Sequence, residues 1–309
     1  MKRIRNIGII LAICLLILTT AGCMKDHPGK RTLMDALAKF SDMTSSVNSG
    51  SLHIDVPSLP LDTTNQPYIE ALLSSLKQGT ITWQGVQDRV AERREADIRI
   101  TTSDGSFTYS LPVIQHQDQI YIHIPIVNTE HEYFSIPVAG VIEDLNRTVR
   151  QSFMYFIEGM EAGWFTIEEQ DDNSQLIELQ ISQSNWLPFL MKVNDAFPQI
   201  VKEFRESGFI SEEQAIRAEE KWHELAEHRQ HIQLSEGTAA YVRALVNEAG
   251  YVTELDAEMS LTAEFEPGQQ ETYGFHLHLT WEAIDEEPEF TKDIPELVIP
   301  FADLLKLVP

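Results

Sequence analysis

Alternation of apolar and polar residues is clearest in two stretches near the C-terminal end, 251–265 and 273–281, which Pro267 and Gly268 separate. A period of two places successive side chains on opposite faces of a β-strand. The pattern therefore predicts a long antiparallel hairpin with one apolar and one polar face. The apolar positions are Leu255, Ala257, Met259, Leu261, Phe275, Leu277 and Leu279.

The same period recurs earlier and predicts a meander, because strands that follow one another in the sequence usually pair in space. The stretch 89–101 is interpreted as a long polar strand, and Asp104 with Gly105 as a hairpin turn. Ile122 and Ile124 belong to a run with isoleucine at every second position. The expected strands cover residues 52–56, 80–83, 89–101, 107–111, 120–126, 133–136, 165–167 and 177–181.

Spacings of three and four residues predict helices between these strands. A first amphipathic helix is expected from Thr32 to Val47, and a second over 141–160. A helical insertion over about 185–232 interrupts the meander. Within it, Pro198 is expected to break or kink the first helix, and the pattern from Ser211 to Gln214 predicts a capping box that opens the second.

Three shorter segments complete the prediction. Residues 68–76 are expected to form a short helix, and the tail from Glu286 to Pro300 is acidic and rich in proline. An apolar turn from Phe301 to Leu307 should dock on the body of the protein. Together the elements predict an α+β fold, a large antiparallel sheet packed on helices, in a single domain over 32–309.

The N-terminal segment has the layout of a secretory signal: a basic start, an apolar run from Ile7 to Leu18, and small residues before Cys23. The run is shorter than the roughly 20 residues of a spanning helix. Thr20 to Cys23 resembles the lipobox of bacterial lipoproteins, although its first position is usually aliphatic. The resemblance implies a signal peptide at 1–22, a diacylglycerol and further acyl group on Cys23, and a polar tether over 23–31. An uncleaved anchor is the alternative.

Charge and cysteine content exclude several function classes. The chain has 48 Asp and Glu against 23 Lys and Arg, which disfavours nucleic acid and a polybasic hold on anionic membranes. Its two cysteines, Cys14 and Cys23, both lie in the N-terminal segment. The mature domain therefore has no thiol for a disulfide, a metal or nucleophilic catalysis. Because its charge disfavours binding to anionic lipids, a covalent lipid is the expected membrane anchor.

Catalytic and cofactor motifs are absent from the sequence. There is no nucleophile elbow, P-loop or GxGxxG motif, so we expect neither enzyme activity nor a cofactor. On the predicted helix His228 and His231 share a face, whereas His223 lies about 140° from His228. His276 and His278 share the polar face of their strand, but a pair without a placed carboxylate is a weak metal site. We therefore expect no metal.

The order of elements resembles the lipoprotein-carrier superfamily of the Lol lipoprotein-localisation factors and the mycobacterial LprG and LppX lipoproteins, together with many lipoproteins of Gram-positive bacteria. Residues 32–56, 119–125 and 250–290 carry the resemblance. It implies a curved, incomplete antiparallel barrel around helices, with an apolar hollow that takes acyl chains. The insertion at 185–232 is longer than this family leads us to expect.

The preferred function is non-catalytic: an extracytoplasmic lipoprotein, anchored in the membrane of a Gram-positive bacterium, that binds or carries a lipid or another apolar ligand. The alternative is a cell-envelope interaction module with a solid core, whose acidic faces and inserted helices engage a protein partner. The first helix could equally fill the hollow, and packing to native density favours that outcome. The candidate ligand face comprises Leu255, Ala257, Met259, Leu261, Phe275, Leu277, Leu279, Ile122 and Ile124.

Overall fold

The computed structural model describes residues 27–55, 79–102, 105–125, 127–138, 141–208, 210–228, 232–234, 240–266 and 268–304. The expected signal peptide, the lipidation site Cys23 and the expected helix at 68–76 lie outside the described residues.

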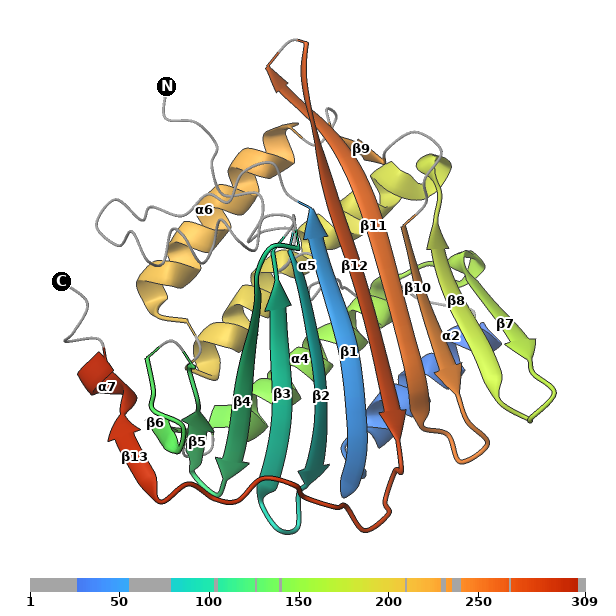
Figure 1. The fold of residues 1–309 in the computed structure, drawn as a ribbon. Helices are drawn as coiled ribbons and strands as arrows, with labels where there is room; N and C mark the ends of the chain where they lie inside the picture. Colours follow the sequence, from blue (N-terminus) through green and yellow to red (C-terminus); the bar gives the residue numbers. More distant parts are fainter. Residues whose placement is uncertain are drawn as a thin grey trace.

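One large, mostly antiparallel sheet organises the described residues (Figure 1). Its strand order is β13-β6-β5-β4-β3-β2-β1-β12-β11-β10-β8-β7, and β9 pairs with β11 outside this path. The sheet is curved and open, with β13 and β7 at its two ends. Only β13 pairs in parallel, with β6, among the described strands. The strands are β1 (Ser45–Asp55), β2 (Thr80–Asp88), β3 (Arg93–Thr101), β4 (Thr108–His116), β5 (Gln119–Ile122), β6 (Glu132–Pro137), β7 (Phe165–Glu169), β8 (Gln175–Ile181), β9 (Ile232–Leu234), β10 (Ala240–Val246), β11 (Val252–Glu266), β12 (Gln269–Glu282) and β13 (Leu297–Pro300).

Helices cover one face of this sheet, which we call the inner face (Figure 1). Helix α2 packs on β7, β8 and β10, and α5 packs on β8 and β9. Helix α4 lies between α2 and α5, and α6 packs on α5. The α+β class with a sheet packed on helices is therefore confirmed. The helical elements are α2 (Pro28–Lys39), α4 (Val141–Gly159), η1 (Ala162–Trp164), α5 (Gln183–Glu206), α6 (Glu212–His228) and α7 (Phe301–Leu304).

The first helix differs from the prediction at both ends. It begins at Pro28, whose fixed φ suits a first helical turn, and the His27 imidazole accepts a hydrogen bond from the Gly29 amide. Residues 28–31, expected in the polar tether, are therefore helical. The helix ends at Lys39 instead of Val47, and the hydroxyl of Ser41 donates to a carbonyl of the last turn. Such local hydrogen bonds compete with helix continuation.

Lys30, in the first turn of α2, is almost fully buried at 2% exposure. Its ammonium donates to the carbonyl oxygens of Glu158 and Met160, at 2.5 and 2.8 Å. These carbonyls lie at the end of α4, where a helix has unpaired acceptors and a partial negative charge. A buried cation thus joins the start of one helix to the end of another.

The helical insertion consists of α5 and α6. Helix α5 continues through Pro198 without a break, because buried Val193 and Val201 hold it against the core on both sides of the proline. The capping box of α6 is confirmed. The Ser211 hydroxyl accepts from the Gln214 amide at 3.2 Å, and the Gln214 side chain accepts from the Ser211 amide at 2.8 Å.

Three strands are present that the sequence pattern did not predict, and two predicted strands are shorter. Strand β9 lies at the end of the expected helical insertion, β10 follows it, and β13 forms in the acidic tail. Strand β3 begins at Arg93, whereas the prediction began it at residue 89. Strand β5 ends at Ile122, whereas the prediction extended it to residue 126. Ile124 lies instead in a turn, where its amide donates to the side chain of Asn128 at 2.7 Å. An asparagine that accepts a local backbone hydrogen bond ends the strand.

The segment from Glu286 to Glu296, which we call the strap, runs along the ends of the strands from β12 to β13 (Figure 1). It lies on the outer face, where the buried carboxylate of Glu95 holds it. That carboxylate accepts from the Thr291 amide and hydroxyl at 2.7 and 2.9 Å and from the Lys292 amide at 3.0 Å.

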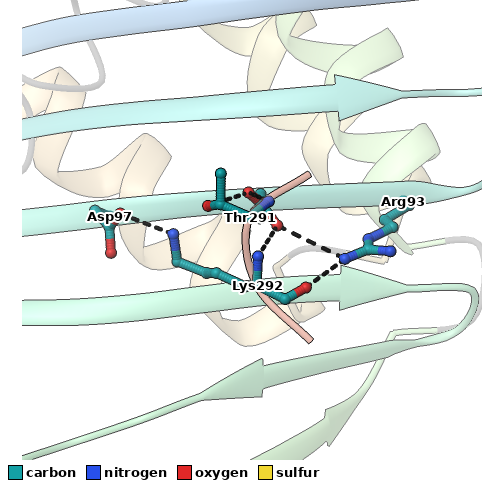
Figure 2. Close-up of polar contacts among 5 residues, drawn as sticks. Arg93, Asp97, Thr291 and Lys292 are labelled. Carbon is teal, nitrogen blue, oxygen red and sulfur yellow. Dashed lines mark hydrogen bonds and ion pairs between the residues drawn. The ribbon is translucent and has the colours of Figure 1, made fainter. Parts of the chain in front are cut away.

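Two further charges reinforce this attachment (Figure 2). The Lys292 ammonium lies 2.8 Å from a carboxylate oxygen of Asp97. The guanidinium of Arg93 donates to the Lys292 carbonyl and stacks over the Phe290 ring at 4.3 Å. Beyond the strap, the ring of Phe301 packs edge-on against Phe134, which confirms that the start of the last apolar turn docks on the body.

Candidate apolar-ligand site

Pairing register aligns the inner-face residues of neighbouring strands into rows that run across the sheet. Residues directly opposite each other in an antiparallel pair point to the same face. Leu52 of β1 is opposite Leu277 of β12 on one side and Ile81 of β2 on the other. The inner face is therefore one apolar surface that continues from β11 and β12 through β1 to β4. On β1 to β4 the first row holds Leu52, Ile81, Ile100 and Tyr109. The second row holds Gly50, Trp83, Ile98 and Leu111. The third row holds Asn48, Gly85, Ala96 and Val113.

The predicted ligand face lies mostly in the half of this surface that the helices cover. Its residues on β11, together with Phe275, are each at most 9% exposed and belong to the hydrophobic core. Leu277 and Leu279 are partly buried against the same core. The structure thus brings these positions together and packs them in one core cluster with residues of α2, α4 and α5.

Ile122 and Ile124 are separated from that group. Ile122 lies on β5 and shares the inner face with Val113, and four strands separate β5 from β12. Ile124 lies in the turn after β5. Both are half-buried. Ile122 therefore belongs to the half of the inner face that lies beyond β1, and Ile124 lies at the margin of that half.

The inner face of β2, β3 and β4 is apolar and remains half-exposed. Among the described residues, the core and the side chains packed against it include none from these three strands. The sequence pattern missed this feature, a set of large apolar side chains on three rows that are only partly buried. Its members are Ile81, Trp83, Ile98, Ile100, Tyr109, Leu111 and Val113.

Trp83 connects the covered and half-exposed halves. A Cβ atom at Gly50 would lie 2.3 Å from Cζ2 of Trp83 and 2.8 Å from Cδ2 of Leu279. The indole therefore occupies the space that any other residue at position 50 would fill. Only glycine permits this close approach, and the apolar surface passes without a gap from Leu279 to Trp83.

Polarity changes toward the other end of the same strands. The fourth inner-face row consists of Ser46, Gln87, Arg94 and Gln115. The Gln87 amide donates to the Ser46 hydroxyl at 2.8 Å and lies 3.7 Å from the Met43 sulfur. The inner face of β2 to β4 thus has three apolar rows, and these end at the fourth row, which we call the polar row; on β1 the third row already holds the polar side chain of Asn48.

The outer face carries the histidines that the sequence analysis weighed as metal ligands. Asp256 is directly opposite His278 and supplies the carboxylate that the sequence alone could not place. One Asp256 oxygen lies 3.0 Å from His276 Nε2 and 3.5 Å from His278 Nδ1. Within the described ranges, no group of three or more metal-binding side chains is arranged to hold an ion.

Opposing effects act on the pKa of Asp256. Burial raises it, but hydrogen bonds from His276 and Tyr241 and the nearby imidazoles outweigh this effect, so the pKa is lowered. Burial and the hydrogen bond to Glu258 raise the pKa of Tyr241, which keeps this phenol protonated as a donor. The cluster is thus a network of cross-strand polar pairs. Of the helix histidines, His223 is exposed on α6, and His231 lies outside the described residues.

No helix in the described part of the chain is long and apolar enough to cross a membrane.

No protein-family profile and no curated protein matches the sequence. Among solved structures, the chain is similar to the lipoprotein LppX of Mycobacterium tuberculosis, with 10% identity, a TM-score of 0.35, and coverage of 86% of this chain and 100% of LppX. A DUF1329 family protein from Desulfovibrio piger has 6% identity and a TM-score of 0.22, over 85% and 93% of the two chains. Lipovitellin has 6% identity and a TM-score of 0.27, and the match covers 82% of this chain but 26% of lipovitellin. LppX is one of the lipoproteins that the order of elements in the sequence resembled.

Proposed function

We propose that this protein binds an apolar ligand on the inner face of β2, β3 and β4, without catalysing a reaction. In this proposal it is an extracytoplasmic lipoprotein, held at the membrane by an acylated Cys23, and the ligand is a lipid or a molecule of similar polarity. The lipobox-like segment supports the location, and the inner face supports the ligand class.

The half-exposed apolar rows of β2 to β4 carry this proposal. Burying apolar surface gains about 25 cal/mol per Å². A ligand that covered the partly buried apolar side chains on the helix-facing side would therefore gain binding free energy. Ile98 and Ile100 lie in successive rows with no polar side chain between them on that face. Apolar lining with few polar groups is typical of small-molecule sites.

Titration with a fluorescent apolar probe tests the proposal. We would use the mature chain with Cys23→Ser, which omits the lipid and retains every residue that the structure describes. Ile98→Asp places a charge on the inner face and should weaken binding at least about tenfold, because a carboxylate is costly in an apolar site. Thr82→Asp adds the same charge to the exposed outer face of β2 and should leave binding within about twofold.

Absence of probe binding by the unsubstituted chain, or equal weakening by both variants, would contradict the proposed site. Absence of binding would instead favour the interaction module. Location is tested separately in the full chain: Cys23→Ala should move the protein from the membrane fraction to the soluble fraction, and a variant that stays in the membrane would contradict lipid anchoring.

A further inference from the structure

The first turns of α5 expose a small apolar surface, which we call the α5 patch: Leu187, Pro188 and Met191. Leu187 and Met191 are each 52% exposed and lie one helical turn apart on the same side of α5. No residue from Gln183 to Met191 is charged, although charged residues make up 23% of the chain. Exposed apolar side chains that gather on an uncharged surface are typical of a contact with a protein or a membrane.

Aromatic packing on the other side of α5 fixes the direction of the patch. Trp186 and Phe189 are buried, and their rings stack with centroids 5.2 Å apart. The Phe189 ring also packs edge-on against the Phe156 ring of α4, at 6.4 Å. Turning Leu187 and Met191 inward would expose these aromatic rings, so the packing of the helix keeps the patch on the surface.

The start of α5 lies at the same end of the molecule as the start of α2 (Figure 1). Lys30, in the first turn of α2, donates to carbonyls at the end of α4, and α4 in turn packs on α5 through Phe156. Neighbouring helix axes are about 8–10 Å apart. Two such steps separate the first turns of α5 from the start of α2, which is a distance of about 16–20 Å.

The short link to the expected lipidation site would hold this end of the molecule near the membrane. Cys23 precedes Pro28, the first residue of α2, by five positions. A chain of that length spans at most about 18 Å. An acylated Cys23 would therefore keep the start of α2 close to the bilayer, and the α5 patch would lie within reach of the same bilayer surface.

We propose that the α5 patch rests on the lipid bilayer, as a second membrane contact beside the acyl groups of Cys23. The inference rests on the location given in the proposed function, because the anchor is what brings the patch to the bilayer. Leu187 and Met191 enter the boundary between head groups and acyl chains. The uncharged start of α5 avoids the repulsion that anionic lipids exert on a chain of net charge −25. Anchor and patch together orient the body of the protein on the membrane.

Fluorescence quenching by labelled lipids tests this contact. We would purify the acylated protein from membranes and reconstitute it in phosphatidylcholine vesicles that contain nitroxide-labelled phosphatidylcholine. A thiol-reactive, environment-sensitive fluorophore would be attached at Ser184→Cys, an exposed position one turn before Leu187 on α5. The control would carry it at Ile216→Cys on α6, the helix that follows the far end of α5, where the native side chain is 49% exposed.

The introduced cysteine is the free thiol of this protein, because Cys23 is acylated and Cys14 leaves with the signal peptide. At position 184 the fluorophore should be quenched by the lipid nitroxides and its emission should shift to the blue. At position 216 it should show neither change. A bilayer that contacts the start of α5 and not the start of α6 produces this difference.

A double variant separates the patch from the anchor. Leu187→Gln with Met191→Gln, in the Ser184→Cys protein, should lower the ratio of membrane-bound to free patch about tenfold, because both positions lose apolar area that the bilayer would bury. Quenching should then fall to near the level at position 216. In the same Ser184→Cys protein, Ile216→Gln removes an apolar side chain of similar exposure and should leave quenching unchanged. These are surface substitutions, so the melting temperatures should stay unchanged.

Two outcomes would overturn the inference while the proposed location stands. One is equal quenching at positions 184 and 216. The other is unchanged quenching in the double variant, which would leave the patch as a surface for a protein partner. Recovery of Cys23→Ala in the membrane fraction would instead reject the proposed location, and the inference with it.

Discussion

The Lys30 ammonium donates a hydrogen bond of 2.8 Å to the carbonyl oxygen of Met160, and both side chains are at most 2% exposed. This contact fixes the start of α2 against the end of α4. In the sequence, the expected lipidation site Cys23 precedes α2 by only a few residues.

Lys30→Met should destabilise the protein by about 2–3 kcal/mol. The change keeps an apolar stem of similar length but leaves the buried Met160 carbonyl and the part-buried Glu158 carbonyl without their charged donor. Chemical denaturation would measure the difference. Lys202→Met, which removes an exposed cation of an i,i+4 pair on α5, should change stability by less than about 0.5 kcal/mol. Equal effects would show that the buried contact is not stabilising.

Gly50→Val should disturb both stability and ligand binding. Its side chain would displace the Trp83 indole and press on Leu279, and overpacking of this kind costs about 1–3 kcal/mol. A shift of tryptophan emission and a lower denaturation midpoint would report the change. Gly163→Ala, where an added Cβ meets no atom within 4 Å, is the control and should alter neither. An unchanged Gly50→Val protein would contradict the close packing of Trp83.

Glu95→Ala should release the strap. The substitution removes the buried carboxylate that accepts three hydrogen bonds from Thr291 and Lys292, and hydrogen bonds to a charged group are the stronger ones, so the cost is at least about 2 kcal/mol. Hydrogen exchange should increase over residues 288–300. Asp97→Ala breaks a half-exposed ion pair with the same lysine and should cost less than about 1 kcal/mol. Protection of the strap that is equal in both variants would exclude Glu95 as its main attachment.

Acid should destabilise the protein partly through Asp285. The Thr44 amide, the Tyr251 hydroxyl and the Thr44 hydroxyl donate to this carboxylate, and the pKa of Asp285 falls below its ordinary 3.8, chiefly because of the Thr44 amide. A carboxyl with a lowered pKa in the folded state stabilises that state above the ordinary pKa. The contribution is lost as pH falls through the lower value.

Melting temperatures between pH 7 and about pH 2.5 test this dependence. The loss of stability on acidification should be smaller in Asp285→Asn than in the unsubstituted chain, because the variant has no carboxylate to protonate. Asp118→Asn, at the exposed turn before β5, should follow the unsubstituted curve. Parallel curves for all three proteins would contradict a role for Asp285.

Long regular patterns allowed much of the fold to be predicted. The alternation through β11 and β12 persists over many residues, so the hairpin and its buried face followed directly. The capping box at Ser211 and Gln214 is a local interaction, and local sequence is enough to specify it. The first helix was extended too far because Met43 and Val47 continue a spacing of three and four. Met43 is buried in the link between α2 and β1, and Val47 lies in β1.

The remaining features depend on contacts between distant segments. Strand β10 has alanine at two of its buried positions, which weakens the apolar alternation. Strand β13 forms because β6 offers a free edge, which a proline-rich tail does not reveal. The candidate site was placed on β11 and β12 because a sequence does not say which part of an apolar face the helices cover. On β3, Ile98 and Ile100 alternate with Asp97 and Arg99, so their strand appeared polar as a whole.

The position of β1 in the sheet has a consequence for the order of folding. It pairs with β2 on one side and with β12 on the other, and the hydroxyls of Ser49 and Thr280, which meet at 2.7 Å, are 231 residues apart in the sequence. Closing so large a loop costs entropy before its contacts are gained, and such pairings slow folding. During synthesis or export from the N-terminal end, β2 to β6 can assemble beside β1 early, whereas the other edge of β1 stays unpaired until nearly the whole chain has emerged. That open edge is a temporary site for mispairing, which makes the interval before β12 arrives the step at which a chaperone would most improve the yield of folded protein.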